Sequence, residues 1–347
     1  LQTLIGALFA VNGPFGAELA ECCEHGLALA TIGSASPMAF PFLYGQFTYN
    51  ISTGKIRQAA DIARRFIQLA DEADNKSGFV VGYRMLGLAL LGLAELREAR
   101  QALETALAAY VPERDDEVAY LFGQNLKVNC QAVLSMVLFW LGEEEAAKRI
   151  GAECLRMAEA LKHPHTLAIG ISYTGCWVNY LTGDIERLRI QASRLVTIAT
   201  DFGLQFYQPI GQFFLGLALY EQGRTELGIG HMEKALTAFE RANFKLAVPA
   251  YLGFLARAKS ETGRTAEAEA ICARAKALMA ECGEVIFEPE LLCIEAEILM
   301  RASSKDAARA RAILDKAIAR AREFASPTME ARCRRVRDRL FADPAPA

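Results

Sequence analysis

Two histidines separated by a proline, His163 and His165, form the one local histidine cluster in this sequence. Such a pair of imidazoles could hold a metal ion or transfer protons. The intervening Pro164 is typical of the first position of a helix, and Thr166 and Leu167 continue a helical pattern. We therefore interpret the pair as a helix boundary, with metal or acid–base chemistry as the alternative.

Three consecutive carboxylates, Glu143, Glu144 and Glu145, are a second candidate for acid–base chemistry. Paired carboxylates act as acid and base only when burial or a neighbour separates their pKa values. These three follow Gly142 and precede an apolar helical series, so they occupy the first turn of a helix, where acidic side chains favour the helix dipole. The sequence predicts a solvated helix start here rather than a catalytic pair.

The nine cysteines stand at irregular spacings and include no CxxC pair. Most lie among alanines and leucines, where a thiol packs as a small hydrophobe. The adjacent Cys22 and Cys23, with His25, offer three possible metal ligands, but tetrahedral zinc needs four ligands that converge. We predict free thiols, no metal site and a reducing, cytoplasmic compartment.

Motifs that would identify a reaction are absent from the sequence. It contains no GxxxxGK[ST] phosphate-binding loop, no HExxH, no GxSxG and no GxGxxG. We therefore predict no catalytic residues and no cofactor, and we expect that this chain is not an enzyme.

A repeated helix–turn–helix pattern dominates the sequence instead. In segment 215–236 an apolar helical series ends at Gly223 and a second one follows, and segment 86–107 repeats that spacing around Ala94. Small residues such as Gly216 let two helix backbones cross closely. Turns aligned in this way recur at intervals of roughly 40 residues, at Gly54, Ala94, Gly142, Gly183, Gly223, Gly263 and near Lys305.

The pattern predicts an all-α fold of tetratricopeptide-like αα-hairpins stacked into a right-handed superhelical solenoid. We expect a single repeat domain over residues 1–340, with roughly seven to eight hairpins and a C-terminal capping helix, and a frayed tail over residues 341–347. The capping helix should begin with Ser326 as its N-cap and Pro327 as its first residue.

Outside this pattern the sequence predicts helices over residues 1–11 and 17–32. Segment 33–41, with prolines at two positions, is predicted to be a loop. Segment 109–117 is predicted to be a longer loop inserted between two hairpins.

Composition and charge exclude some function classes. Apolar residues make up 52% of the 347 residues, and the longest apolar run, about residues 132–141, is too short to span a membrane. Segment 301–340 holds twelve basic and five acidic residues, a net charge of +7, whereas the whole chain carries −3. Only Phe324 is available there to stack on a base, so we predict no nucleic-acid binding. A solvated face is expected, with contact to an acidic surface in the chain or in a homodimer as the alternative.

In tetratricopeptide geometry the first helix of each hairpin lines a concave groove. The groove positions include Leu88, Leu91, Met136 and Leu217. The residues predicted to bind a partner there are Arg84, Phe139, Tyr173, Trp177, Tyr180, Phe213 and Tyr220. Aromatic rows of this kind can anchor a peptide or a helix. Alternatively, these side chains pack between helices or close the superhelix on itself.

Several phrases, taken in order, resemble one family. They are PFLYGQFTYNISTGKIRQAADIARRFIQLADEA (41–73), YRMLGLALLGLAELREARQALETALAAY (83–110), YLFGQN (120–125), VLFWLGEEEAA (137–147), LKHPHTLA (161–168) and EPELLCIEAEILM (288–300). The chain resembles the C-terminal tetratricopeptide-like region of bacterial multidomain adenylate/guanylate cyclases, in which a class III cyclase domain and a P-loop ATPase domain precede the repeats. The resemblance implies that catalytic residues would lie upstream and that this region is regulatory. Asn125 departs from the family, which tends to have Asp there.

We therefore expect a non-catalytic scaffold for protein–protein or interdomain regulatory interaction, as part of a bacterial cyclase–ATPase signalling protein. Its partners would be a protein, a peptide or upstream domains of the same protein. The alternative is a small-molecule sensor with a pocket on the concave aromatic face, near Tyr173, Trp177 and Phe213.

Overall fold

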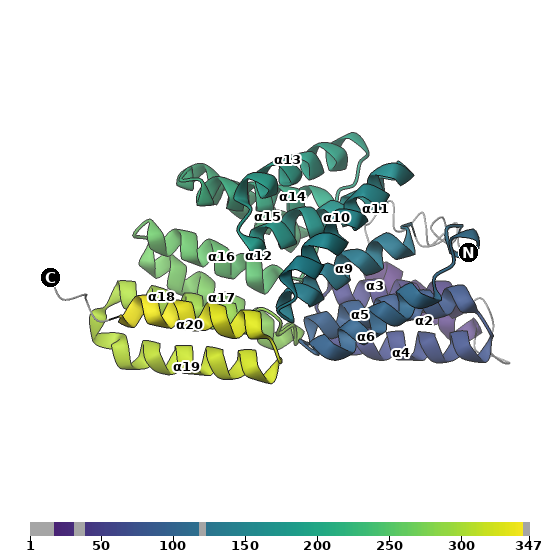
Figure 1. Cartoon of the computed structure of the whole chain (residues 1–347), viewed down its shortest axis with the longest axis horizontal. Coiled ribbons are helices and arrows are strands. Elements are labelled where there is room, and N and C mark those ends of the chain that lie inside the picture. The colour runs from purple at the N-terminus through teal and green to yellow at the C-terminus, as the bar shows by residue number, and fades with distance from the viewer. Residues whose placement is uncertain (1–16, 31–38, 118–122, 343–347) are drawn as a thin grey trace.

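The structure is a computed structural model, and it describes residues 17–30, 39–117 and 123–342. The helix predicted over residues 1–11 lies outside these ranges. The described part of the chain is helical and contains no β-strand (Figure 1), so the all-α prediction is confirmed. None of the helices within these ranges is both long enough and apolar enough to cross a bilayer.

After α2 (Ala17–Ala30), seven hairpins follow one another within the described ranges. Their paired helices are α3 (Ala39–Ser52) and α4 (Ile56–Glu72), α5 (Lys76–Gly92) and α6 (Leu96–Ala109), α9 (Leu126–Trp140) and α10 (Glu144–Leu161), a composite helix and α13 (Ile185–Asp201), α14 (Tyr207–Glu221) and α15 (Thr225–Arg241), α16 (Val248–Glu261) and α17 (Thr265–Cys282), and α18 (Glu288–Ala302) and α19 (Ala307–Glu323). The composite helix consists of α11 (Pro164–Gly170), the π-helix η1 (Ile171–Val178) and α12 (Asn179–Thr182), and α20 (Pro327–Phe341) ends the series.

The predicted turns lie between the two helices of each hairpin, which confirms the repeat spacing. Six of them reverse the chain at a residue with positive φ: Gly54, Ala94, Gly142, Gly183, Gly223 and Gly263. Glycine favours this conformation because it has no Cβ, whereas Ala94, at φ 60°, pays about 1–2 kcal/mol for it. The last predicted turn, near Lys305, is the short 3₁₀ helix η2 (Ser304–Asp306).

Small residues allow the helices of a hairpin to cross closely, as predicted for Gly216. A Cβ at Gly216 would lie 2.7 Å from the carbonyl oxygen of Gly228 and 2.8 Å from the Cβ of His231. A Cβ at Gly87 would lie 2.5 Å from the Cγ of Leu103. Any larger residue at these two positions would push the hairpin helices apart.

The sequence predicted the start of the C-terminal helix α20 correctly, but it placed the start of α3 too late. Ser326 is the N-cap of α20, as predicted, and its hydroxyl accepts a hydrogen bond from the Met329 amide. The predicted loop 33–41 was wrong at its end, because α3 already begins at Ala39. Pro41 fits there since an amide in the first turn has no partner within the helix. At Asn125 the side chain caps α9, a role that Asp would also serve.

Two other predicted irregular segments contain helix. The loop predicted over residues 109–117 includes the short helix α7 (Pro112–Asp115). At the other end, α20 extends through Phe341, over whose ring the guanidinium of Arg311 lies at 4.0 Å. The predicted tail beyond residue 342 lies outside the described residues.

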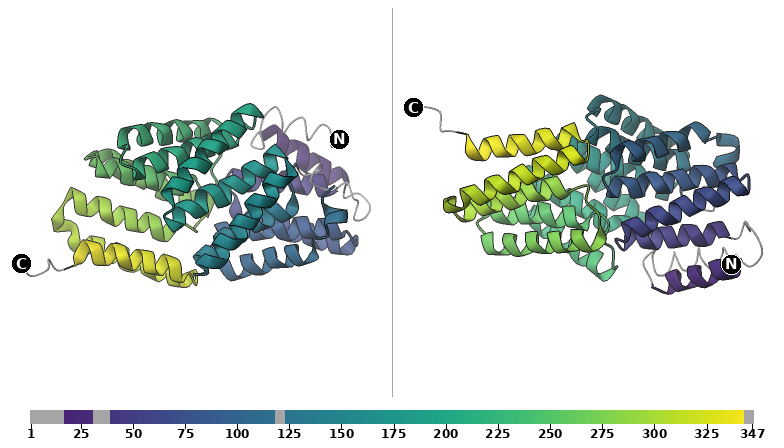
Figure 2. Two further views of the ribbon diagram at one scale, coloured as in Figure 1. Left: turned by 45° about the horizontal axis from the view of Figure 1, so that its top comes forward. Right: turned by 90° about the horizontal axis from the view of Figure 1, so that it is seen from below.

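The solenoid closes on itself, because loops between its last hairpins contact turns inside its first ones. The amide of Lys245 donates to the Ser52 carbonyl at 2.8 Å, and the amide of Val285 donates to the Gly92 carbonyl at 2.9 Å. One repeat further along both segments, the Ser326 hydroxyl donates to the Trp140 carbonyl. We call these three hydrogen bonds the closure contacts. Figure 2 shows the C-terminal helices beside the N-terminal hairpins in two views.

Candidate ligand-binding cavity

The closed superhelix surrounds a cavity of about 980 Å³ on its inner face. Its walls come mainly from the first helices of the hairpins and from the loops that join successive hairpins, and Phe66 of α4 adds one side chain from a second helix. Small-molecule sites in proteins commonly enclose 300–1,000 Å³ and are mostly apolar. The aromatic side chains in the wall are Phe40, Tyr44, Phe47, Phe66, Tyr173, Trp177, Phe202, Phe206, Tyr207, Phe244, Tyr251 and Phe287.

One edge of the cavity reaches the surface at the loop between α13 and α14. Phe202 in this loop lines the cavity although 60% of its surface is exposed, and Gly203 and Gln205 beside it are also exposed. A large exposed aromatic ring at the edge of an apolar cavity is a suitable first contact for an apolar ligand.

Three of the predicted groove residues lie in the cavity wall, and four do not. The wall contains Arg84, Tyr173 and Trp177, together with the groove positions Leu88, Leu91 and Met136. The groove position Leu217 is fully buried and is absent from the described part of the wall. Phe139, Tyr180, Phe213 and Tyr220 are absent from the described part of the wall.

The π-helix η1 places two of the aromatic wall residues. Tyr173 and Trp177 both lie in η1, and such wide turns within α-helices are often found at functional sites. The Trp177 ring stacks on Phe287, with centroids 4.8 Å apart, and on Tyr251 at 5.6 Å. Trp177 therefore connects the middle of the chain to a C-terminal loop across the closed superhelix.

The four remaining groove residues contact other parts of the protein. Phe213 is fully buried against Tyr251, with ring centroids 4.3 Å apart. The carbonyl of Phe139 accepts a hydrogen bond from the Thr328 hydroxyl at 2.8 Å, beside a closure contact. Tyr220 donates its hydroxyl proton to Glu261. Tyr180 belongs to a network of charged side chains.

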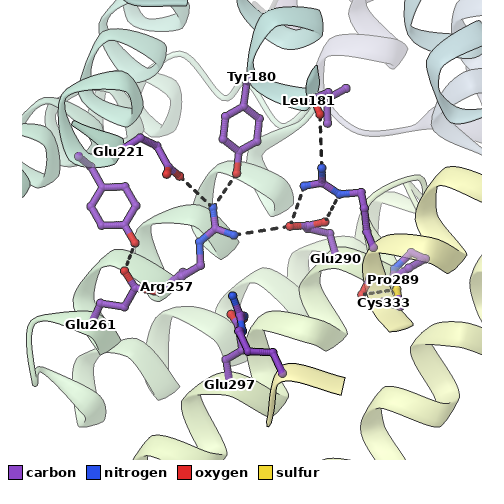
Figure 3. Close-up of polar contacts among 12 residues, drawn as sticks. Tyr180, Leu181, Glu221, Arg257, Glu261, Pro289, Glu290, Glu297 and Cys333 are labelled. Atoms are coloured by element: carbon purple, nitrogen blue, oxygen red, sulfur yellow. Dashed lines mark hydrogen bonds and ion pairs between the residues drawn. The ribbon is translucent and has the colours of Figure 1, made fainter. Parts of the chain in front are cut away.

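A charged network joins α12, α14, α16, α18 and α20 (Figure 3), and its member on α14 is Glu221, 3.5 Å from Arg257. Arg257 on α16 donates to the Tyr180 hydroxyl at 2.6 Å and lies 3.6 Å from Glu290 on α18. Arg332 on α20 contacts the same carboxylate at 3.2 Å and also donates to the Leu181 carbonyl at 3.4 Å. Burial alone would raise the pKa of Glu290, but Arg332 and Arg257 outweigh it and lower the pKa. In this network the positive charges of Arg257 and Arg332 pair with a carboxylate of the protein itself, so the network connects helices rather than binding a ligand.

The histidine pair serves the helix start, as predicted from Pro164. His163 is the N-cap of α11, and its ring accepts from the Thr166 amide. His165 bonds through Nδ1 to the Gly123 carbonyl and through Nε2 to the Tyr207 hydroxyl at 2.9 Å. Burial lowers the pKa of His165, so its ring is neutral at physiological pH. Because both ring nitrogens form hydrogen bonds, His165 connects Gly123 and Tyr207 within the cavity wall.

The other candidates for chemistry are also accounted for by structure. Glu143, Glu144 and Glu145 are exposed at the start of α10, and Lys148 pairs with the last two at 2.7 and 3.2 Å. All nine cysteines are free thiols, and only Cys22 is not fully buried. Within the described ranges, His, Cys, Asp and Glu form no group of three or more that could hold a metal ion.

Among the described residues of the cavity wall, Arg84 and Glu284 carry charged groups. Arg84 is 3% exposed and is discussed below. Glu284, in the loop before α18, is 4% exposed and accepts a hydrogen bond from the Ala247 amide at 2.8 Å. Burial raises the pKa of Glu284 to about 7.

Replacing Glu284 by Gln should remove a pH dependence of stability. Because the folded-state pKa is raised above the ordinary value for Glu, the protonated side chain favours the folded state at low pH, and this contribution is lost as the pH rises to about 7. We therefore compare the free energy of unfolding of the wild type with that of Glu284→Gln. The wild-type value should fall relative to the variant by up to about 3 kcal/mol as the pH rises from the ordinary pKa of Glu to above 7. Urea unfolding at pH 5 and pH 8 measures it, with the exposed Glu281→Gln as the control. A constant difference between the two proteins would contradict the assignment.

Sequence reasoning missed the contribution of the loops between hairpins. The wall includes Leu204, Leu246 and Ile286 from three such loops. A loop that faces only water is usually polar. The apolar residues at equivalent places in three successive loops were therefore an available signal that these loops are covered.

Comparisons with known proteins bear on the fold. No family model matches the chain, and no curated protein matches it. A Rap protein complexed with competence and sporulation factor has 13% sequence identity over 97% of this chain and 95% of its own, with a TM-score of 0.53. Aspartyl phosphate phosphatase F from Bacillus subtilis has 11% identity over 100% and 96% of the two chains, with a TM-score of 0.49. A signal transduction ATPase with a tetratricopeptide repeat sensor, from Pyrococcus horikoshii, has 13% identity over 94% and 55%, with a TM-score of 0.47. The chain is a tetratricopeptide-like α solenoid.

Proposed function

We propose that this chain is a non-catalytic regulatory module that binds a small ligand inside its closed superhelix. The observation that supports this most is the apolar cavity of about 980 Å³ on the face where an open solenoid would present a groove. The closure contacts cross that face, so it suits a small molecule or a short peptide better than a long helix. A Rap protein has been crystallised with competence and sporulation factor, and at 13% identity it illustrates the fold rather than the ligand.

The ligand would act through the closure contacts. They are few hydrogen bonds between segments far apart in sequence, and the cavity wall includes the residues Ser52 and Gly92 that accept two of them. A ligand that touches both sides favours the closed state over an open one, and such a population shift is the basis of regulation by binding. The proposed output is a change in how the outer surface meets a protein partner or a neighbouring domain.

The parent protein is a separate proposal. The resemblance of the sequence supports a bacterial adenylate/guanylate cyclase with a P-loop ATPase, in which residues 1–340 form one cytoplasmic regulatory domain. Nine free thiols support the reducing compartment. The coding sequence upstream of Leu1 tests this proposal: a cyclase domain and a GxxxxGK[ST] motif are expected there, and an unrelated domain would reject it.

Binding of a neutral apolar probe tests the proposed cavity. Titration with 1-pyrenebutanol, followed by its fluorescence, should show binding to the wild type. Leu88→Trp places a larger ring in the cavity wall and should weaken binding about tenfold or more. Leu227→Trp, at an exposed position on α15, is the matched control and should bind like the wild type. No binding to the wild type, or equal binding by Leu88→Trp, would contradict the proposal.

A further inference from the structure

We propose that the ligand of this cavity carries a single carboxylate on an apolar body and that Arg84 binds that carboxylate. This inference rests on the proposed ligand-binding function.

Arg84 is a buried guanidinium that pairs with no acidic side chain among the described residues. Within those residues its Nε and Nη2 atoms have no hydrogen-bond partner, and the side chain is 3% exposed. Two other buried or half-buried arginines, Arg257 and Arg332, do have an acidic partner, because both contact Glu290. A buried charge without a partner costs several kcal/mol, and an anionic group on a ligand that paired with Arg84 would offset this cost.

Two aromatic rings position the guanidinium in the cavity wall. The guanidinium carbon lies 5.5 Å from the ring centroid of Tyr44 and 5.6 Å from that of Phe47, and all three residues line the cavity. Cation–π contacts of this kind contribute about 0.5–2 kcal/mol each, but a ring face does not replace the two N–H···O hydrogen bonds that an anion would accept from the guanidinium. The rings therefore hold Arg84 in place without replacing an anion.

The surroundings of Arg84 favour one carboxylate over a phosphate. Among the described wall residues there is no lysine and no second arginine, and both nitrogens of His165 are engaged. One guanidinium matches one carboxylate through two parallel hydrogen bonds, whereas a phosphate dianion is usually held by several positive groups. The aromatic wall supplies apolar contact for the remainder of the ligand.

Two probes that differ only in the charged group test this inference. 1-Pyrenebutyrate and 1-pyrenebutanol share the same pyrene ring and chain. The difference between their affinities for the wild type therefore measures the contribution of the carboxylate. We expect the acid to bind about tenfold or more tightly than the alcohol, as one charge-assisted pair would give. In Arg84→Met the two probes should bind alike, and Arg84→Lys should retain part of the preference. Arg57→Met, at an exposed position on α4, is the matched control and should keep all of it.

A competition experiment distinguishes a carboxylate ligand from a phosphate ligand. 1-Naphthylacetate should displace 1-pyrenebutyrate from the wild type, and 1-naphthyl phosphate should displace it less well. Equal or stronger displacement by the phosphate would overturn the assignment to a carboxylate.

The outcomes separate this inference from the function on which it rests. If acid and alcohol bind the wild type equally, the role of Arg84 is wrong while the cavity proposal survives. If neither probe binds the wild type, both are wrong. This comparison needs no variant, so an equal affinity for acid and alcohol would reject the role of Arg84 even if Arg84→Met does not fold.

Discussion

Replacing Gly54 by Ala should destabilise the protein clearly more than replacing Gly223 by Ala, and it should open the closed superhelix. Both glycines have a left-handed backbone, with φ of 84° and 81°, so both variants lose about 1–2 kcal/mol from the added Cβ. At Gly54 that Cβ would also lie 2.3 Å from the Sγ of Cys282, whereas at Gly223 nothing lies within 4 Å. Overpacking of this kind adds about 1–3 kcal/mol.

Urea unfolding of the two variants measures the difference, and small-angle X-ray scattering measures the opening. Gly54→Ala should have a larger radius of gyration than Gly223→Ala and should lose affinity for 1-pyrenebutanol. Adding Cys282→Ala to Gly54→Ala should recover part of the stability, because it removes the clashing sulfur. Equal effects at the two glycines would mean that the contact between these segments does not form in solution.

Replacing Glu290 by Gln should lower the free energy of unfolding by about 3–5 kcal/mol. Glu290 is 17% exposed and is the carboxylate shared by Arg257 and Arg332. Its neutralisation removes the carboxylate that pairs with Arg332, and among the described carboxylates Arg257 then pairs with Glu221 alone, at 3.5 Å. Urea unfolding measures the loss, and limited proteolysis should show earlier release of α20, which carries Arg332.

An exposed ion pair provides the matched control for Glu290. Glu186 is 60% exposed and pairs with Arg189 at 2.7 Å on the outer surface. Pairs of this type contribute about 1 kcal/mol or less. Glu186→Gln should therefore change stability little, and a similar effect of the two variants would argue against a buried network.

Features set by neighbouring residues could be predicted from the sequence. The turn at Gly223, the close crossing at Gly216 and the N-cap Ser326 each depend on backbone conformation or on contacts within one hairpin. Helical periodicity carries this information directly. For the same reason, the repeat spacing placed the hairpin turns correctly along the chain.

Closure could not be predicted, because it depends on how a small rotation accumulates over many repeats. The Lys245 amide meets the Ser52 carbonyl only after several hairpins have stacked. The groove pattern therefore placed Arg84 and Trp177 in the wall, but it also included Phe213, which Tyr251 covers in the closed superhelix.

Two properties of the cavity wall had no pattern in the sequence. Periodicity gave no sign of η1, which places Tyr173 and Trp177. Nor does an arginine among aromatic residues reveal that Arg84 pairs with no acidic side chain in the described part of the chain, because that depends on side chains from other helices.

Hydrogen exchange of the Lys245 and Val285 amides, with and without 1-pyrenebutyrate, tests most directly whether a closed superhelix holds a ligand. Both amides donate across the closure, so peptides spanning residues 244–247 and 284–287 should exchange slowly in the free protein. The probe should slow them further, and it should leave unchanged the peptide around Gly223, where a Cβ would meet nothing within 4 Å. Rapid exchange of both amides that the probe does not alter would contradict the account.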